Sequence, residues 1–307
     1  METLQRTANR GSVSTGFNID HSVNLFANNN ENLHKTNSGA GNRRTFTISF
    51  WTKRTHLTGV KQYIFEAGNS DADDDRFTIR FGVGNTLDIQ TSATYLITNR
   101  LFRDVAAWYH IVLKVDTTDG TAANRMKLYV NGVEETSFAT DNRGSINQNF
   151  DFSVNNNEIH NIGNSRIEGD ESYDYSGYIS EFVILDGTAS TPTAFGEVDE
   201  DSGIWKPISL SALSYGTNGA LLEFKNPSSM GVNTAGTGNF TVNNVNQNDQ
   251  ATDTPTNSFC TLNSLSYNST VSFLKGSVAM AKSDGTYGMT SGTHYVGAGK
   301  WYWEVKA

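Results

Sequence analysis

Short segments in which apolar and polar residues alternate recur along most of the chain. The clearest are residues 108–116 (WYHIVLKVD) and 126–133 (MKLYVNGV). Alternation with a period of two is typical of a β-strand that buries one face. The pairs Asp119-Gly120 and Asn131-Gly132 provide turns, because Asn, Asp and Gly tolerate positive φ. The two segments therefore predict adjacent strands of a β-meander, with Trp108 at one end.

The same alternation predicts further strands between residues 19 and 200. They fall at residues 45–53, 63–67, 77–83, 87–90, 95–97, 159–163 and 176–187. Ten or more short strands with turn signals between them, and no long helical pattern, predict an all-β fold. A span of about 180 residues is large for an immunoglobulin-like sandwich. It suits a jelly-roll sandwich of two antiparallel sheets.

Four regions follow from changes in this pattern. Residues 1–18 are polar and aperiodic, which predicts an N-terminal arm, either disordered or ordered on a partner. Residues 19–200 form the sandwich, and residues 201–262 are a Gly/Asn-rich linker region with brief strands. Residues 263–307 form a smaller β-rich region that closes on an aromatic alternating segment.

Composition and charge exclude several classes of protein. Only 36% of the 307 residues are hydrophobic and 18% charged, which favours strands and turns over long helices. The net charge of −9, without a basic stripe, argues against a nucleic-acid partner. No stretch approaches the ~20 apolar residues of a membrane span, and no secretory signal is expected. The one cysteine, Cys260, is predicted to be a small buried residue rather than a reactive thiol.

Four motifs carry a resemblance to a known superfamily. In order they are FTISFW (46–51), WYHIV (108–112), LYVNG (128–132) and GYISEF (177–182). They resemble the laminin-G-like, concanavalin-A-like lectin superfamily over roughly residues 20 to 200. The resemblance implies a two-sheet jelly roll, but this fold hosts lectins, adhesion modules and glycosidases alike.

Shorter motifs resemble two other groups. Residues 19–22, 39–46 and 249–259 are similar to stretches of tail-fibre-like proteins of marine bacteriophages, and residues 297–306 (GAGKWYWEVK) to the opening strand of a SPRY domain. The first resemblance implies a virion component on the tail or particle surface. It also implies attachment to other virion proteins through the N-terminal arm, and homotrimers.

The loop at residues 170–175 is the candidate ligand site. Sugars stack their apolar faces on aromatic rings and accept or donate hydrogen bonds at carboxylates and amides. This loop offers both residue types, which makes Asp170, Tyr173, Asp174 and Tyr175 the candidate ligand-binding residues. The alternative is that the two tyrosines belong to a core.

A second acidic loop is the candidate metal site. Asp71, Asp73, Asp74 and Asp75 cluster between two predicted strands, and hard carboxylate oxygens at this spacing suit Ca²⁺. The resemblance to laminin-G-like domains also implies calcium at a loop rim. The alternative is a solvated acidic loop, and no other cofactor is expected.

Catalysis has weaker support. Glucanases of this superfamily carry carboxylates at i, i+2 and i+4 of one strand, and the nearest match is Glu197, Asp199 and Asp201. The last acid is Asp rather than Glu, and Glu200 would point a charge into the sheet core. The segment is therefore interpreted as a solvated linker, and an enzyme is not expected. His110 is interpreted as a strand-surface residue rather than a ligand.

Three hypotheses for function remain. The first is a receptor-binding appendage of a bacteriophage that recognises host surface glycans, with several copies converting weak affinity into avidity. The second is a capsid decoration or head-fibre protein that binds no sugar. The third, and least supported, is a polysaccharide hydrolase.

Overall fold

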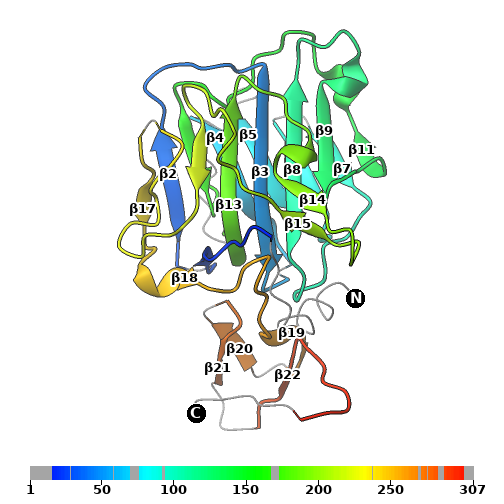
Figure 1. Cartoon of the computed structure of the whole chain (residues 1–307), viewed down its shortest axis with the longest axis vertical. Helices are drawn as coiled ribbons and strands as arrows, with labels where there is room; N and C mark the ends of the chain where they lie inside the picture. Colours follow the sequence, from blue (N-terminus) through cyan, green and yellow to red (C-terminus); the bar gives the residue numbers. More distant parts are fainter. Residues whose placement is uncertain are drawn as a thin grey trace.

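The computed structural model describes residues 16–27, 29–57, 59–69, 76–91, 94–166, 173–236, 238–268, 271–274, 276–282 and 287–300. The sandwich consists of two antiparallel sheets of eight strands each, stacked face to face (Figure 1). The predicted all-β sandwich is therefore confirmed. Among the described residues, no helix has the length and apolar character to cross a membrane.

The first sheet has the order β10-β9-β8-β3-β13-β1-β18, and β16 also pairs with β13. Its strands are β1 (Ser22–Leu25), β3 (Thr45–Arg54), β8 (Tyr109–Asp116), β9 (Met126–Val130), β10 (Val133–Glu134), β13 (Gly177–Asp186), β16 (Ala220–Leu222) and β18 (Gln250–Ala251).

The second sheet has the order β11-β7-β6-β5-β4-β12-β2-β17. Its strands are β2 (Asn32–Thr36), β4 (Gln62–Gly68), β5 (Arg76–Phe81), β6 (Leu87–Gln90), β7 (Thr94–Thr98), β11 (Phe138–Asp141), β12 (Ile159–Ile162) and β17 (Thr241–Asn243).

The predicted meander is confirmed in register. β8 pairs with β9 so that Val112 lies opposite Tyr129, and β9 turns back into β10. Asn131 and Gly132 have φ of 49° and 80°, the left-handed region that their residue types tolerate. A Cβ on Gly132 would lie 2.4 Å from the Trp205 ring, so this turn also needs Gly for close packing.

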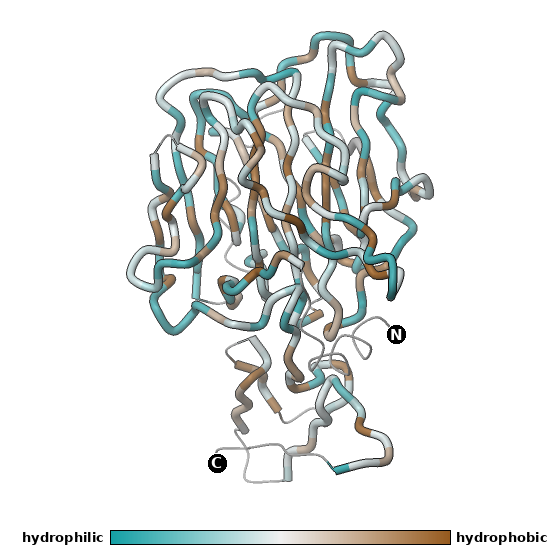
Figure 2. Tube along the Cα trace, in the orientation of Figure 1, coloured by the Kyte–Doolittle hydropathy of each residue, from teal (hydrophilic) through white to brown (hydrophobic). Residues whose placement is uncertain are grey.

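The core lies between the two sheets and is rich in phenylalanine. The alternation of apolar and polar residues seen along the strands in Figure 2 places one set of side chains inward. Phe50 of β3 stacks on Phe182 of β13 with ring centroids 5.5 Å apart, and Phe182 also contacts Phe65 of β4 at 5.6 Å. Rings from both sheets thus interlock at the centre of the sandwich.

The outer face of the first sheet is covered by later parts of the chain. Trp205, in the hairpin formed by β14 (Gly196–Val198) and β15 (Trp205–Pro207), lies over His110 and donates from Nε1 to His110 Nδ1 at 3.0 Å. The interpretation of His110 as a strand-surface residue is therefore wrong. The local sequence gives no sign of this, because the covering residue Trp205 comes 95 positions later. Burial lowers the pKa of His110 to about 3.

Because the Trp205 indole can only donate, His110 Nδ1 must accept, and the ring is neutral with its proton on Nε2. His110 Nε2 then donates to Ser49 Oγ at 2.9 Å. A neutral, fully bonded histidine of this kind has a structural role.

The segment predicted as a linker supplies strands to both sheets. Within residues 201–262, β16 and β18 join the first sheet and β17 joins the second. Brief strands are expected here from the sequence, but with two or three residues each they are too short for their pattern to indicate which sheet they join. Four short 3₁₀ turns complete the described sandwich: η1 (Ala122–Asn124), η2 (Arg143–Ser145), η4 (Pro192–Ala194) and η5 (Gln247–Asp249).

Two hairpins follow at one end of the sandwich (Figure 1). β19 (Leu262–Tyr267) pairs with β22 (Thr290–Gly292), and β20 (Val271–Leu274) pairs with β21 (Ala279–Lys282). Cys260 lies just before β19 and is exposed, so its predicted burial is wrong. A hydrogen bond with His294 lowers the pKa of its thiol to about 7.

Candidate ligand pocket on the second sheet

The outer face of the second sheet is polar and yet largely buried. β5 directs Phe77, Ile79 and Phe81 into the core, so Arg76 and Arg80 lie on the opposite face. Both arginines donate to the Tyr63 hydroxyl, at 2.7 and 2.6 Å. Both arginines are only 9% exposed although they lie on the outer face of the sheet. Another part of the chain must therefore shield their charges from water.

The segment that follows β12 provides part of this cover. Arg166 donates its backbone N–H to Glu66 Oε2 at 2.9 Å, while Arg76 Nε lies 2.9 Å from Glu66 Oε1. Further along, Asp174 forms a β-bridge with Tyr63, and the rings of Tyr173 and Tyr63 lie 6.1 Å apart. The cover is thus attached to β4 at two points.

A polar pocket of about 160 Å³ lies where this cover meets β2 and β17. Its lining consists almost entirely of amide, hydroxyl and charged side chains: Asn30, Asn32, Asn164, Ser165, Arg166, Asp174 and Asn243.

Hydrogen bonds fix the asparagines of this pocket. Asn164 Nδ2 donates to Asn30 Oδ1 at 2.5 Å, and Asn243 Nδ2 donates to Asn30 O at 3.0 Å. Asn161, from β12, donates its Nδ2 to Asn164 Oδ1 at 2.6 Å. The walls are therefore preorganised, which reduces the entropy lost when a ligand binds.

Two polar atoms at this site are buried without a partner. Ser165 Oγ and Asn161 Oδ1 have no hydrogen-bond partner, although both side chains are at least 95% buried. Folded proteins rarely leave such groups unpaired, because each costs about 1–3 kcal/mol. Of the two, Ser165 lines the pocket, so a ligand or water there can pair with its hydroxyl.

The predicted site residues fall in different environments. Asp174 lines the pocket, and Tyr173 lies half-buried beside it. Tyr175 is fully buried in the core, with its hydroxyl 2.6 Å from Thr52 Oγ1, so it cannot present a face to a ligand. Burial raises its pKa above the ordinary range. Asp170 lies outside the described residues.

The predicted calcium ligands cannot be placed. Asp71, Asp73, Asp74 and Asp75 all lie outside the described residues. Within the part of the chain that the structure describes, no group of three or more His, Cys, Asp or Glu side chains is arranged to hold a metal ion.

The asparagines of the pocket are the residues that sequence reasoning missed. They come from positions 30, 32, 164 and 243, and no spacing connects them. Only the pairing of β2 with both β12 and β17 brings them together. A run of polar residues before β2, at 28–32 (NNNEN), is the one local signal that could have drawn attention to this site.

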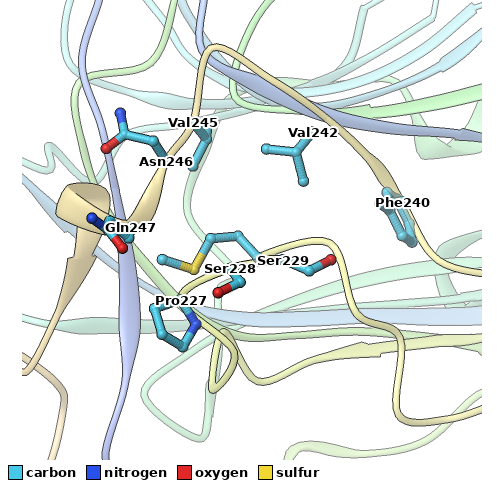
Figure 3. A pocket seen from close by; sticks show the side chains of 9 residues that line it. Pro227, Ser228, Ser229, Phe240, Val242, Val245, Asn246 and Gln247 are labelled. Carbon is cyan, nitrogen blue, oxygen red and sulfur yellow. The ribbon is translucent and has the colours of Figure 1, made fainter.

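A larger groove of about 560 Å³ lies at the β17 edge (Figure 3). Pro227, Ser228 and Ser229 face Val245, Asn246 and Gln247 across it. Met230 and Phe240 also line the groove but are almost fully buried. None of its lining residues has a buried polar atom without a partner, so the smaller polar pocket is the better candidate for a specific ligand.

The acidic segment considered for catalysis lies elsewhere, on the β14–β15 hairpin. Glu197 and Asp199 both pair with Lys206 Nζ, at 3.4 and 3.1 Å. Hydrogen bonds from Ser202 and Lys206 lower the pKa of Asp199 to about 2, so it holds no proton to donate near neutral pH. Asp199 therefore lacks the raised pKa of a general acid.

The family is established by comparison with known proteins. The family model described as the concanavalin A-like lectin/glucanases superfamily matches residues 27–193, which is more than half of the chain. The chain belongs to this family, as the four motifs of the sandwich indicate. No curated protein matches it.

Several solved structures are similar in fold. A heptameric SAP-like pentraxin from Limulus polyphemus is 21% identical, with 56% of this chain and 78% of that chain covered and a TM-score of 0.42. A putative carbohydrate binding protein from Bacteroides ovatus is 16% identical, with 74% and 59% covered and a TM-score of 0.49. A Ruminococcus gnavus sialidase module, CBM40, bound to α2,3 sialyllactose is 15% identical, with 52% and 85% covered and a TM-score of 0.34. At these values the likenesses say nothing about a ligand.

Proposed function

We propose that this protein is a non-enzymatic glycan-binding module and that the polar pocket on its second sheet is the binding site. The observation that carries the proposal is the unpartnered buried hydroxyl of Ser165 in a pocket built from amides, a guanidinium and a carboxylate. A sugar hydroxyl both donates and accepts hydrogen bonds, so one hydroxyl of a bound ring can pair with Ser165 Oγ.

The surroundings of the pocket suit a sugar better than an apolar ligand. Asp174 and Asn32 offer acceptors, and Arg166 offers donors at the open side. Tyr173, next to Lys61 with the ammonium 5.2 Å from its ring, provides an aromatic surface for an adjoining sugar unit. The family's fold is compatible with this role but does not determine it.

A conservative substitution tests the site. Ser165→Ala removes a hydroxyl that has no partner within the protein, so folding should be unaffected or slightly favoured. Glycan binding should weaken about 2- to 12-fold, the value of one hydrogen bond of ~0.5–1.5 kcal/mol. Ser264→Ala is the matched control, because Ser264 Oγ is also buried and unpartnered but lies in β19.

The measurement is a glycan array followed by calorimetric titration of the strongest binder. Loss of affinity in Ser165→Ala alone supports the site. Equal affinity of both variants and wild type would show that the glycan binds elsewhere on the protein. An array on which no glycan binds would refute the proposed function.

We propose further that the module acts as a bacteriophage appendage, displayed in several copies on the particle. The support is the resemblance of residues 19–22, 39–46 and 249–259 to tail-fibre-like proteins. Multiple copies would convert a modest sugar affinity into avidity. Fluorescently labelled protein should then stain host cells, and Ser165→Ala should reduce the staining.

Failure to stain host cells, combined with antibody labelling over the capsid, would favour a decoration protein. A hydrolase is disfavoured by the pairing of Glu197 and Asp199 with Lys206. Release of reducing ends from host polysaccharide by wild type, but not by Glu197→Ala, would reverse that conclusion.

A further inference from the structure

The groove at the β17 edge reaches the core of the sandwich (Figure 3). β17 ends the second sheet, and among the described residues only β2 pairs with it. Met230 and Phe240 line the groove and belong to the central core cluster. Val242 and Val245 line it as well and pack against that cluster. The volume of about 560 Å³ lies within the range of about 300–1,000 Å³ that is typical of small-molecule sites.

The two rims of the groove are tied together beyond each of its ends. On one side, Phe240 donates its backbone N–H to Gly231 O at 2.8 Å. On the other side, Gln250 donates its Nε2 to Phe224 O at 2.7 Å. The width of the groove is therefore fixed before a ligand arrives, which reduces the entropy lost on binding. Closed ends also favour a compact ligand over a long extended chain.

Free hydrogen-bonding groups lie on both rims. Ser228 and Gln247 are exposed, Ser229 is half-buried, and these residues face one another across the groove (Figure 3). Within the part of the chain that the structure describes, their two hydroxyls and one amide make no hydrogen bond to the protein. A ligand in the groove can therefore both donate to these side chains and accept from them.

The groove is also uncharged. None of its lining residues is ionisable. The charged residues that flank the two rims are already occupied: Lys225 Nζ lies 2.6 Å from Glu223 Oε1, and Asp249 Oδ2 accepts from Asn246 N at 2.7 Å. A charged ligand would lose hydration here without gaining a counter-ion. A purely apolar ligand would cover the free hydroxyls and amide and leave them unpaired.

We propose that this groove is a second binding site and that it takes a neutral, compact, polyhydroxylated ligand, namely a neutral mono- or disaccharide. The C–H face of a sugar ring would lie against Pro227 and Val245, and its hydroxyls would pair with Ser228, Ser229 and Gln247. The site is separate from the polar pocket, which lies on the other face of the same strand.

Neighbouring residues of β17 show this separation. Val242 lines the groove and Asn243 lines the polar pocket. Successive residues of a strand point to opposite faces of the sheet. A ligand in the groove therefore does not compete with a glycan in the pocket, and the two sites can be tested separately.

The experiment is a titration of the ¹⁵N-labelled full chain with maltose, lactose and cellobiose, with glucuronate and glucosamine as charged probes. Millimolar concentrations are needed, because Phe240 is only 4% exposed and offers no aromatic face to the sugar. The amides of Ser228, Ser229 and Gln247 should show saturable shifts with at least one neutral disaccharide and weaker binding of both charged probes. No saturable shift at these amides with any neutral sugar would overturn the inference, and so would equal affinity for the charged probes.

Two variants test the rims. Gln247→Ala should weaken binding of the neutral sugar about 2- to 12-fold, the value of one hydrogen bond. Gln148→Ala is the matched control, because Gln148 is also exposed but bonds to Thr118 O elsewhere on the sandwich. Ser228→Trp should fill the groove and abolish the shifts, while thermal unfolding stays unchanged because the position is exposed. Wild-type affinity in both groove variants would overturn the inference.

The pocket variant separates this inference from the proposed function. Ser165→Ala should leave the groove titration unchanged. Neutral sugars that shift only the pocket amides would overturn the inference and leave the proposed function intact. Groove amides that respond in a protein whose pocket binds no glycan would support the inference and refute the proposed site.

Discussion

Asp253 is predicted to hold the segment after β18 against the first sheet, and its removal should destabilise the whole sandwich. Lys53 of β3 is fully buried, and its Nζ lies 2.8 Å from Asp253 Oδ2. The other carboxylate oxygen accepts from Trp108 Nε1 at 2.9 Å. Asp253 lies in the TDTPTNSF stretch (252–259), so this stretch has a structural role here.

The magnitude follows from burial. Asp253→Ala would leave the Lys53 ammonium without its counter-ion in a dry site, a loss of about 3–5 kcal/mol in the free energy of unfolding. Asp151→Ala is the comparison, because the Arg44–Asp151 pair has the same 2.8 Å separation but is more than 40% exposed on both sides. Solvent screens that exposed pair, so it should contribute far less than the buried one.

Urea denaturation at neutral pH measures both variants. Adding Lys53→Met to Asp253→Ala should recover part of the loss, because no buried charge remains. The reasoning is refuted if Asp253→Ala costs no more than Asp151→Ala, or if the double variant is less stable than the single one.

Two further predictions concern the strands around this region. Burial, together with the nearby Glu223, raises the pKa of Glu181 to about 8. A raised carboxyl pKa means that stability is full below the unfolded value near 4.5 and declines as pH rises to about 8. Glu181→Gln should therefore gain stability over wild type at pH 8 relative to pH 5, and an equal difference at both pH values would contradict the assignment. Gly132→Ala should cost about 1–3 kcal/mol, because φ is +80° and the Trp205 ring is in the way. Gly120→Ala, with open space around its Cβ position, should change little in the same thermal unfolding assay.

The strands could be predicted from the sequence because their cause is local. Pairing of Val112 with Tyr129, and the turn at Asn131-Gly132, follow from a period of two and from residue types that accept positive φ. These signals lie within about twenty residues of one another. The sandwich fold and the family could be predicted for the same reason, because the motifs that indicate them are short and continuous in the sequence.

The pocket and the outer layers could not be predicted in this way. Asn30 and Asn243 are joined by a hydrogen bond across 213 positions, and nothing in either neighbourhood indicates the other. His110 and Tyr175 have sequence surroundings compatible with a surface, yet distant residues cover them: Trp205 lies over His110, and Tyr175 contacts Thr52 inside the core. Local pattern fixes which face of a strand is apolar, but not which segment covers the polar face.

Titration of ¹⁵N-labelled protein with the strongest binder from the array tests glycan recognition at the polar pocket most directly. The largest amide shifts are predicted at Asn164, Ser165 and Asp174, with smaller ones at Asn32 and Asn243. Shifts confined to the groove of residues 227–247, or to the hairpins, would contradict the proposed site.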